Sequence, residues 1–198
     1  MPHPSVAQAQ YTKRLDEAIA LATDAFRDKV RKGSGIPYVT HLLQVMVFVA
    51  EHGGDEDQMI AAVLHDYLED IHDAEASDLE ARFGPRVRRM VEALSDATSQ
   101  PKPPWEERKR AYIASLREEP AEVKLISVAD KLHNALSIRR DFARIGVAIF
   151  DRFSASQDQT LWYYESVVVA LGEGWQHPLL EVLRAEVTAM VAESNAAG

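Results

Sequence analysis

The chain has 198 residues, a length that suits one compact domain able to bury its own hydrophobic core. It contains no cysteine, which excludes disulfide frameworks, thiolate zinc sites and cysteine nucleophiles. Its formal net charge of −9 argues against a general binder of nucleic acid or acidic membranes, because such a protein needs a basic surface. No apolar run is longer than that of residues 45–50, which is too short to span a membrane, and the first residues carry no signal-peptide pattern, so we expect a cytoplasmic protein.

Apolar residues recur at helical spacing along nearly the whole chain, as in helices that each bury one face. The first predicted helix covers residues 8–29 and leads into a loop at 31–37, which contains two glycines and a proline. Thr40 is expected to cap a second helix, and Gly53 is placed to end it.

A third helix is predicted to begin with a capping box formed by Asp55 and Gln58 and to continue to Asp70. Further helices are predicted up to residue 193, among them 105–117, 121–138, 142–150, 157–171 and 179–193. No segment has a convincing strand or hairpin pattern. The sequence therefore predicts an all-α fold, a single compact bundle of about eight or nine helices over residues 8–193, with flexible ends at 1–7 and 194–198.

Four ionisable side chains follow an apolar run at the end of the third predicted helix: His65, Asp66, Glu69 and Asp70. On a continuous helix His65 would lie one turn from Glu69, and the adjacent His65 and Asp66 would point about 100° apart. A metal between these two side chains can be reached by both. An isolated His-Asp pair is usually a surface pair, and the second one, at residues 72–73, is assigned no role.

Two more polar residues stand out in apolar surroundings. His41 begins the second predicted helix, and Asp130 lies in the otherwise apolar stretch 125–132. Each has an ordinary alternative, His41 as a packing histidine and Asp130 as the partner of a neighbouring basic residue. Together with His65 and Asp66 they form a set of two imidazoles and two carboxylates. That set suits Mn²⁺, Fe²⁺ or Zn²⁺ and leaves coordination positions open, as catalytic metal sites do.

The order of these motifs resembles the HD superfamily of metal-dependent phosphohydrolases. Within it, the chain is similar to the hydrolase domain of RelA/SpoT-type enzymes and to the stand-alone small alarmone hydrolases. The resemblance covers roughly residues 8–172, and its segments are RKGSGIPYVTH (31–41), AAVLHDYLED (61–70), FGPRV (83–87), VADKLHN (128–134) and LWYY (161–164). It implies an HD-domain helical fold and a Mn²⁺ site formed by His41, His65, Asp66 and Asp130, with Glu69 and Asp70 as catalytic residues beside the attacking water.

The reaction that this resemblance implies is removal of the 3′-diphosphate from (p)ppGpp, giving GDP or GTP and pyrophosphate. Arg31 and Lys32, in a basic cluster with Arg27 and Lys29, are expected to grip the base and phosphates. Asn134, one turn beyond Asp130, is expected to help hold the nucleoside, and Lys131 is either a further ligand of the substrate or a plain surface charge. The expected partner is a small phosphorylated nucleotide, with no nucleic acid and no membrane, for a monomer or small homo-oligomer.

Two departures from the family pattern leave the substrate open. Leu42 follows the first histidine where proline is common, and residues 71–74 replace a segment in which threonine is common. One alternative is therefore an HD phosphohydrolase acting on an adenosine alarmone, a deoxynucleotide or a phosphorylated cofactor. A second alternative is a nucleotide sensor without turnover. Tyr112 and the aromatic residues at 162–164 are expected to pack in the core.

Overall fold

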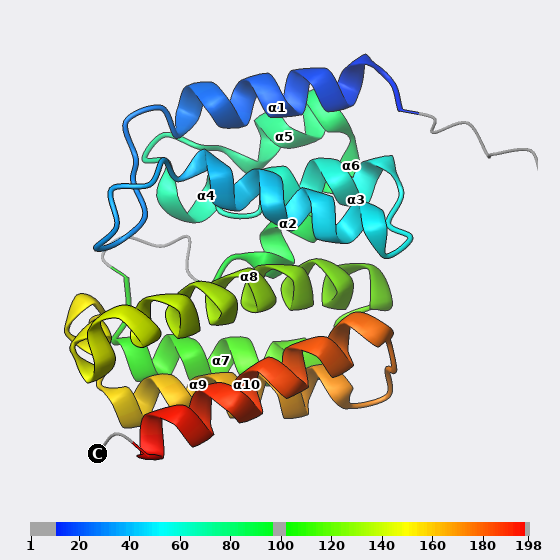
Figure 1. The fold of residues 1–198 in the computed structure, drawn as a ribbon. Helices are drawn as coiled ribbons and strands as arrows, with labels where there is room; N and C mark the ends of the chain where they lie inside the picture. The colour runs from blue at the N-terminus through cyan, green and yellow to red at the C-terminus, as the bar shows by residue number, and fades with distance from the viewer. Residues whose placement is uncertain (1–10, 97–101, 197–198) are drawn as a thin grey trace, which may run out of the picture.

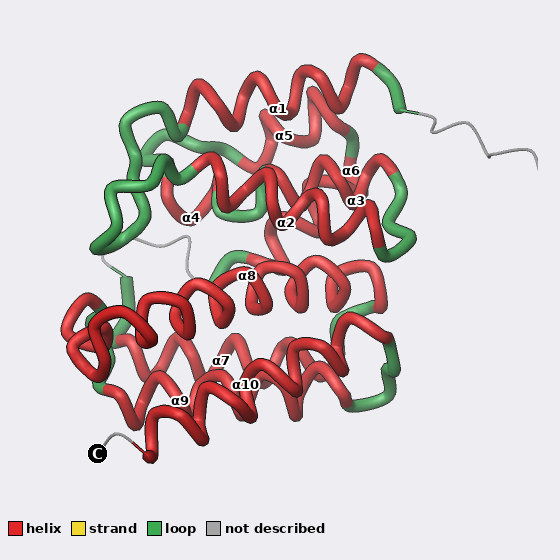
Figure 2. The backbone as a smooth tube through the Cα atoms, viewed as in Figure 1, coloured by secondary structure: helices red, strands yellow, loops and turns green. Residues whose placement is uncertain are grey.

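The computed structural model describes residues 11–96 and 102–196 (Figures 1 and 2). Within these ranges the all-α prediction is confirmed, because no strand forms and the only β-pairing is an isolated bridge between Val30 and Pro37. The same ranges hold nine helices of at least eight residues, one single-turn helix and one 3₁₀ helix. They are α1 (Lys13–Ala25), α2 (Val39–Glu51), α3 (Glu56–Val63), α4 (Tyr67–Asp70), α5 (Ala76–Phe83), α6 (Pro85–Leu94), α7 (Trp105–Glu118), α8 (Ala121–Ile145), η1 (Gly146–Arg152), α9 (Gln157–Gly172) and α10 (Pro178–Ala196).

The long helix α8 lies between two groups of helices, with α1 to α6 on one side and α7, α9 and α10 on the other (Figure 1). It packs against α2 and α6 in the first group and against α10 in the second. Every residue from 123 to 130 is buried, so this part of α8 is enclosed by protein on all sides. Polar groups here need partners, and the Lys124 ammonium donates to the carbonyls of Arg117 and Glu173, at 2.9 and 2.7 Å.

The loop between α1 and α2 is closed by its own backbone. The Arg31 N–H donates to the Ile36 carbonyl at 2.8 Å, and the Tyr38 N–H donates to the Lys29 carbonyl at 2.9 Å. Gly33 turns the chain with a φ of 71°, which only glycine adopts readily. The predicted basic residues are thus carried on a closed turn that packs next to α2.

The predicted capping box of the third helix is confirmed, because the Asp55 side chain accepts from the Gln58 N–H and the Gln58 side chain accepts in return. Thr40 does not cap α2, however. It lies inside the first turn, where its hydroxyl donates to the Pro37 carbonyl at 2.7 Å. No helix of the described ranges is long and apolar enough to cross a membrane.

The largest differences from the predicted boundaries are at three other helices, and the first of these also ends at Ala25 and not at residue 29. The first helix begins at Lys13, and the predicted residues 8–10 lie outside the described ranges, as does the predicted flexible end at 1–7. The separate helix predicted at 142–150 is wrong, because α8 continues to Ile145 and ends only where Gly146 takes a φ of 61°. The last helix continues to Ala196, which includes three residues of the predicted flexible C-terminus.

Candidate active site and metal centre

His65 and Asp66 lie at a break between α3 and α4, and the prediction of one continuous helix here is wrong. The His65 side chain accounts for the break. Its Nδ1 donates to the Ala62 carbonyl at 2.8 Å, and in a continuing helix that carbonyl would accept from the Asp66 N–H. The Tyr67 N–H bonds instead to the Leu64 carbonyl, at 2.8 Å. The chain therefore turns sharply and directs both side chains toward α2 and α8.

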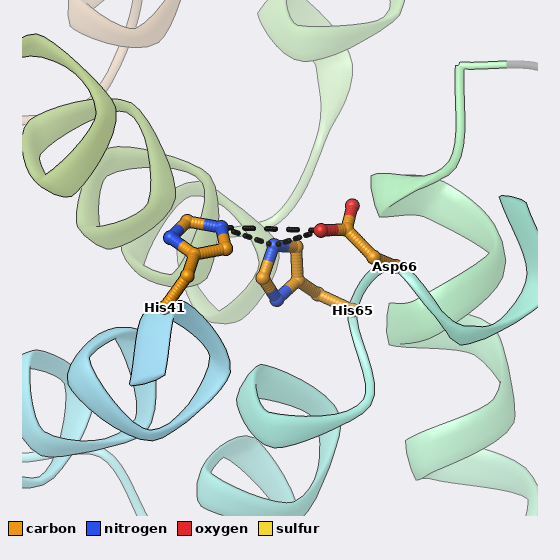
Figure 3. A group of neighbouring side chains, drawn as sticks. All are labelled: His41, His65 and Asp66. Carbon is orange, nitrogen blue, oxygen red and sulfur yellow. Dashed lines mark hydrogen bonds and ion pairs between the residues drawn. The ribbon is translucent and has the colours of Figure 1, made fainter. Parts of the chain in front are cut away.

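The four predicted metal ligands meet at this turn. Figure 3 shows His41 of α2 pointing toward His65 and Asp66. The Nε2 atoms of the two histidines are 3.3 Å apart, and the His65 Nε2 is 3.1 Å from Asp66 Oδ2. Asp130, from α8, places its Oδ1 3.2 Å from the His41 Nε2 and 3.7 Å from the His65 Nε2. Three elements far apart in sequence thus direct two imidazoles and two carboxylates to one point.

The donor set fits a divalent metal. One ligand atom each from His41, His65 and Asp66 lies within 4.8 Å of the others, and Asp130 adjoins both histidines. Because the His65 Nδ1 proton is engaged by a backbone carbonyl, the Nε2 lone pair of the neutral ring faces the cluster. Nitrogen and oxygen donors of this kind suit a first-row transition metal.

Opposite charges lie next to one another at the cluster. Burial opposes ionisation of Asp130, but the neighbouring Lys131 and His41 hold the pKa of its carboxyl well below the usual range. Burial likewise opposes a charge on His65, whereas the carboxylates of Asp66 and Asp130 raise its pKa well above normal. The site therefore attracts a proton or cation strongly. A divalent metal would compete with the histidine proton for the same carboxylates.

The cluster opens onto a cavity of about 370 Å³ between the two groups of helices. Eight of the ten predicted site residues line it. They are Arg31, Lys32, Asp66, Glu69, Asp70, Asp130, Lys131 and Asn134. The other two, His41 and His65, are buried and meet the cavity through their carboxylate neighbours. The cavity thus has an acidic end at the cluster and basic side chains along its wall.

The two predicted catalytic carboxylates have different surroundings. Glu69 Oε1 accepts from the Lys102 ammonium at 3.0 Å, and its Oε2 lies 3.5 Å from the Asp96 N–H. Burial and the Asp96 charge raise the pKa of Glu69, and Lys102 acts in the opposite direction. Asp70 is held in an ion pair with Lys29. Glu69 is therefore the carboxyl whose proton affinity is raised by its environment.

A chain of hydrogen bonds links the basic loop to the cluster. The Arg31 guanidinium donates to Asn134 Oδ1 at 2.8 Å, and Asn134 Nδ2 donates to Asp130 Oδ1 at 2.6 Å. Lys131 is not a plain surface charge. It pairs with Asp130 and lies 5.1 Å from the centre of the Tyr112 ring. Only Arg27 of the predicted basic cluster is absent from the cavity lining, since it pairs with Asp24 at the surface.

Sequence reasoning missed several polar residues of the cavity region, and Tyr38 and Lys109 are two of them. The Tyr38 hydroxyl donates to Asp66 Oδ2 at 2.5 Å, and burial and the Asp66 charge raise its pKa, so it remains a donor. Lys109 lines the cavity, pairs with Asp96 and lies 4.9 Å from the Tyr163 ring centre. No spacing in the sequence marks either residue, because both contacts join separate elements of the fold.

The predicted packing of aromatic residues is confirmed for Tyr112, Tyr163 and Tyr164, which are buried, and all three also face the cavity.

The second His-Asp pair, at residues 72–73, lies exposed and contacts only itself among the ion pairs of the described residues. The two His-Asp pairs of the chain therefore lie in different surroundings. The His-Asp pair set among apolar helices joins the site, and the pair in the loop does not.

Comparisons with known proteins agree with this architecture. The sequence model of the HD domain family matches residues 18–160, and the chain belongs to that family. The guanosine-3′,5′-bis(diphosphate) 3′-pyrophosphohydrolase MESH1 of Mus musculus is 35% identical over 130 residues, which cover 64% of this chain and 70% of the mouse protein. The bifunctional (p)ppGpp synthase/hydrolase SpoT of Escherichia coli is 33% identical over 151 residues, 70% of this chain and 21% of SpoT.

A solved structure supports the same fold over nearly the whole chain. It is described as a metazoan ortholog of SpoT that hydrolyzes ppGpp and plays a role in starvation responses. The two chains superpose with a TM-score of 0.77 at 28% identity, covering 93% of this chain and 99% of the other. The structural match therefore covers more of the chain than the family model, which spans residues 18–160.

Proposed function

We propose that this chain is a Mn²⁺-dependent (p)ppGpp 3′-pyrophosphohydrolase, which releases GDP or GTP and pyrophosphate. The observation that carries the proposal is the convergence of His41, His65, Asp66 and Asp130 at the end of a cavity with basic walls. The similarity to mouse MESH1 supports the choice of substrate. A cavity of about 370 Å³ lies within the range of roughly 300–1,000 Å³ that is usual for small-molecule sites.

The substrate is proposed to lie with its phosphates toward the cluster. Arg31, Lys32 and Lys131 supply positive charge along the wall, and this charge offsets that of a diphosphate. Arg31 is held by Asn134, so its planar group has a defined orientation for a base or a phosphate. A divalent metal held by the four ligands would polarise a phosphoryl oxygen and make a water more acidic.

Glu69 is the group to which we assign the proton of the attacking water. Its carboxylate lines the cavity and is held by Lys102 and the Asp96 N–H, so its orientation is fixed. A base works best when its pKa lies near the working pH, and burial together with Asp96 shifts the Glu69 pKa upward. Asp70, which is paired with Lys29, is assigned the role of holding that lysine at the cavity.

The proposal is tested by incubating metal-stripped protein with ppGpp, with and without Mn²⁺, and separating the products by anion-exchange chromatography. We expect GDP and pyrophosphate only when Mn²⁺ is present, and parallel reactions with Fe²⁺ and Zn²⁺ rank the metals. Release of orthophosphate alone would contradict the proposed bond cleavage. Faster turnover of an adenosine alarmone or a deoxynucleotide would give the site another substrate, and binding without turnover would make the chain a sensor.

Changing Arg31 to alanine is expected to raise KM by about 10–100-fold with kcat changed by less than about threefold. The reason is that a hydrogen bond to a charged group contributes about 1.5–3 kcal/mol, and this contact holds substrate and transition state alike. Arg27→Ala is the matched control, because that guanidinium is exposed and does not line the cavity. An unchanged KM in Arg31→Ala would mean that other residues of the cavity wall bind the nucleotide.

A further inference from the structure

His41 and His65 are held at their outer nitrogens by different kinds of partner. The His65 Nδ1 bonds to the Ala62 carbonyl, which can only accept, so its proton must reside on Nδ1. The His41 Nδ1 lies 2.7 Å from Nδ1 of another imidazole, that of His133 on α8. An imidazole nitrogen can either donate or accept, so this partner leaves two arrangements open.

Only one proton fits between two nitrogens 2.7 Å apart. If His133 donates it, neutral His41 carries its own proton on Nε2, directed at Asp130 Oδ1, which is 3.2 Å away. In this tautomer the His41 Nε2 is protonated, and it therefore cannot bind a metal. If His41 donates, its Nε2 lone pair is free and points into the cluster, and His133 keeps its proton on Nε2.

We propose that His133 is a positioning residue for the metal centre, which accepts the Nδ1 proton of His41 and thereby holds the His41 Nε2 ready for the metal. Metal binding then requires the shared proton to lie on His41, and the hydrogen bond between His41 and Asp130 is given up. This inference rests on the proposed metal site, but it does not depend on which nucleotide is hydrolysed. His65 thus has a fixed tautomer, and the tautomer of His41 is set by His133.

The burial of the pair favours such a role. His41 is 1% exposed, so water cannot replace the partner of its Nδ1. The two rings lie with their centres 4.9 Å apart and their planes 19° from parallel, which keeps the facing nitrogens in register. His133 is one turn beyond Asp130 on the same helix, so α8 supplies both a metal ligand and the residue that orients another ligand.

The test measures binding of Mn²⁺ alone, without nucleotide, by equilibrium dialysis of four proteins. His133→Leu removes the acceptor and is expected to weaken Mn²⁺ binding by about 10–100-fold, the usual cost of losing an outer hydrogen bond to a metal ligand. His133→Asn places an amide oxygen where Nδ1 stood and is expected to recover most of the affinity. His52→Leu is the matched control, since this half-buried histidine contacts the Phe48 carbonyl away from the site.

A second measurement uses the unaltered protein loaded with Zn²⁺, which is diamagnetic. Ring ¹⁵N chemical shifts are expected to show His41 protonated at Nδ1 and coordinated at Nε2, with His133 protonated at Nε2. Equal Mn²⁺ affinity of native protein and folded His133→Leu would overturn the proposal, and so would equal losses in the leucine and asparagine variants. Normal metal binding by a protein that leaves ppGpp intact would overturn the proposed substrate and leave the role of His133 standing.

Discussion

Asp130→Asn is expected to lower kcat by at least about 10³-fold and to strip the protein of its metal. Asp130 contacts both histidines of the cluster, and an amide lacks the charge that attracts a divalent cation. Loss of the metal removes several kcal/mol of transition-state stabilisation, and each 1.36 kcal/mol corresponds to a factor of ten in rate. Metal content after dialysis and kcat for ppGpp with added Mn²⁺ are the two measurements.

The same substitution also leaves the Lys131 ammonium without its partner in a nearly enclosed position. We therefore expect the free energy of unfolding to fall by up to about 3 kcal/mol in urea titrations. The double variant Asp130→Asn/Lys131→Met removes the unpaired charge and is expected to recover stability without recovering metal. Asp141→Asn, on the same helix and cavity wall, is the control that should keep its metal. Metal retention in Asp130→Asn would show that Asp130 is no ligand.

Most of the fold could be predicted from the sequence because the spacing of apolar residues and the capping residues mark each amphipathic helix. The buried face of α1 repeats every three or four residues, and the capping box at Asp55 starts α3 where the sequence indicates. The break after α3 could not be predicted in this way, because no glycine or proline marks it. It arises from the hydrogen bond between the His65 ring and the Ala62 carbonyl, which forms only when the ring is positioned in the folded cluster.

The candidate site was predictable to the extent that polar residues stand out in apolar helices. His41 and Asp130 are 89 positions apart, yet each interrupts a buried helix face, and the structure brings them within 3.2 Å. The partners that orient them come from tertiary packing and leave no comparable pattern. Tyr38 and Lys109 are ordinary by composition and spacing. The contact of Tyr38 with Asp66 depends on how α2 and α4 pack, and that of Lys109 with Asp96 on how α6 and α7 pack.

Glu69→Gln is expected to lower kcat by about 10²–10⁴-fold, the usual contribution of a positioned acid or base, while KM and metal content stay near their native values. The amide keeps the shape of the side chain, and its one oxygen can still accept from Lys102, while the weaker contact with the Asp96 N–H is lost. The main change is therefore loss of the carboxylate that accepts the proton. Asp70→Asn is the matched comparison and should reduce kcat by less than about tenfold, because that carboxylate is paired with Lys29. The reverse order of effects would assign the proton to Asp70, and loss of the metal from Glu69→Gln would refute the role of Glu69.

The pH profile supplies an independent check on Glu69. A base must be ionised to act, so kcat should fall as the pH drops through the Glu69 pKa, which burial and Asp96 raise above that of an ordinary glutamate. The Lys102 ammonium opposes this rise, and Lys102→Met should therefore move the acid limb of the profile to higher pH. Because the metal is the same in both proteins, its own effect on the pKa cancels in the comparison. A limb that stays in place in Lys102→Met would mean that a group other than Glu69 takes the proton.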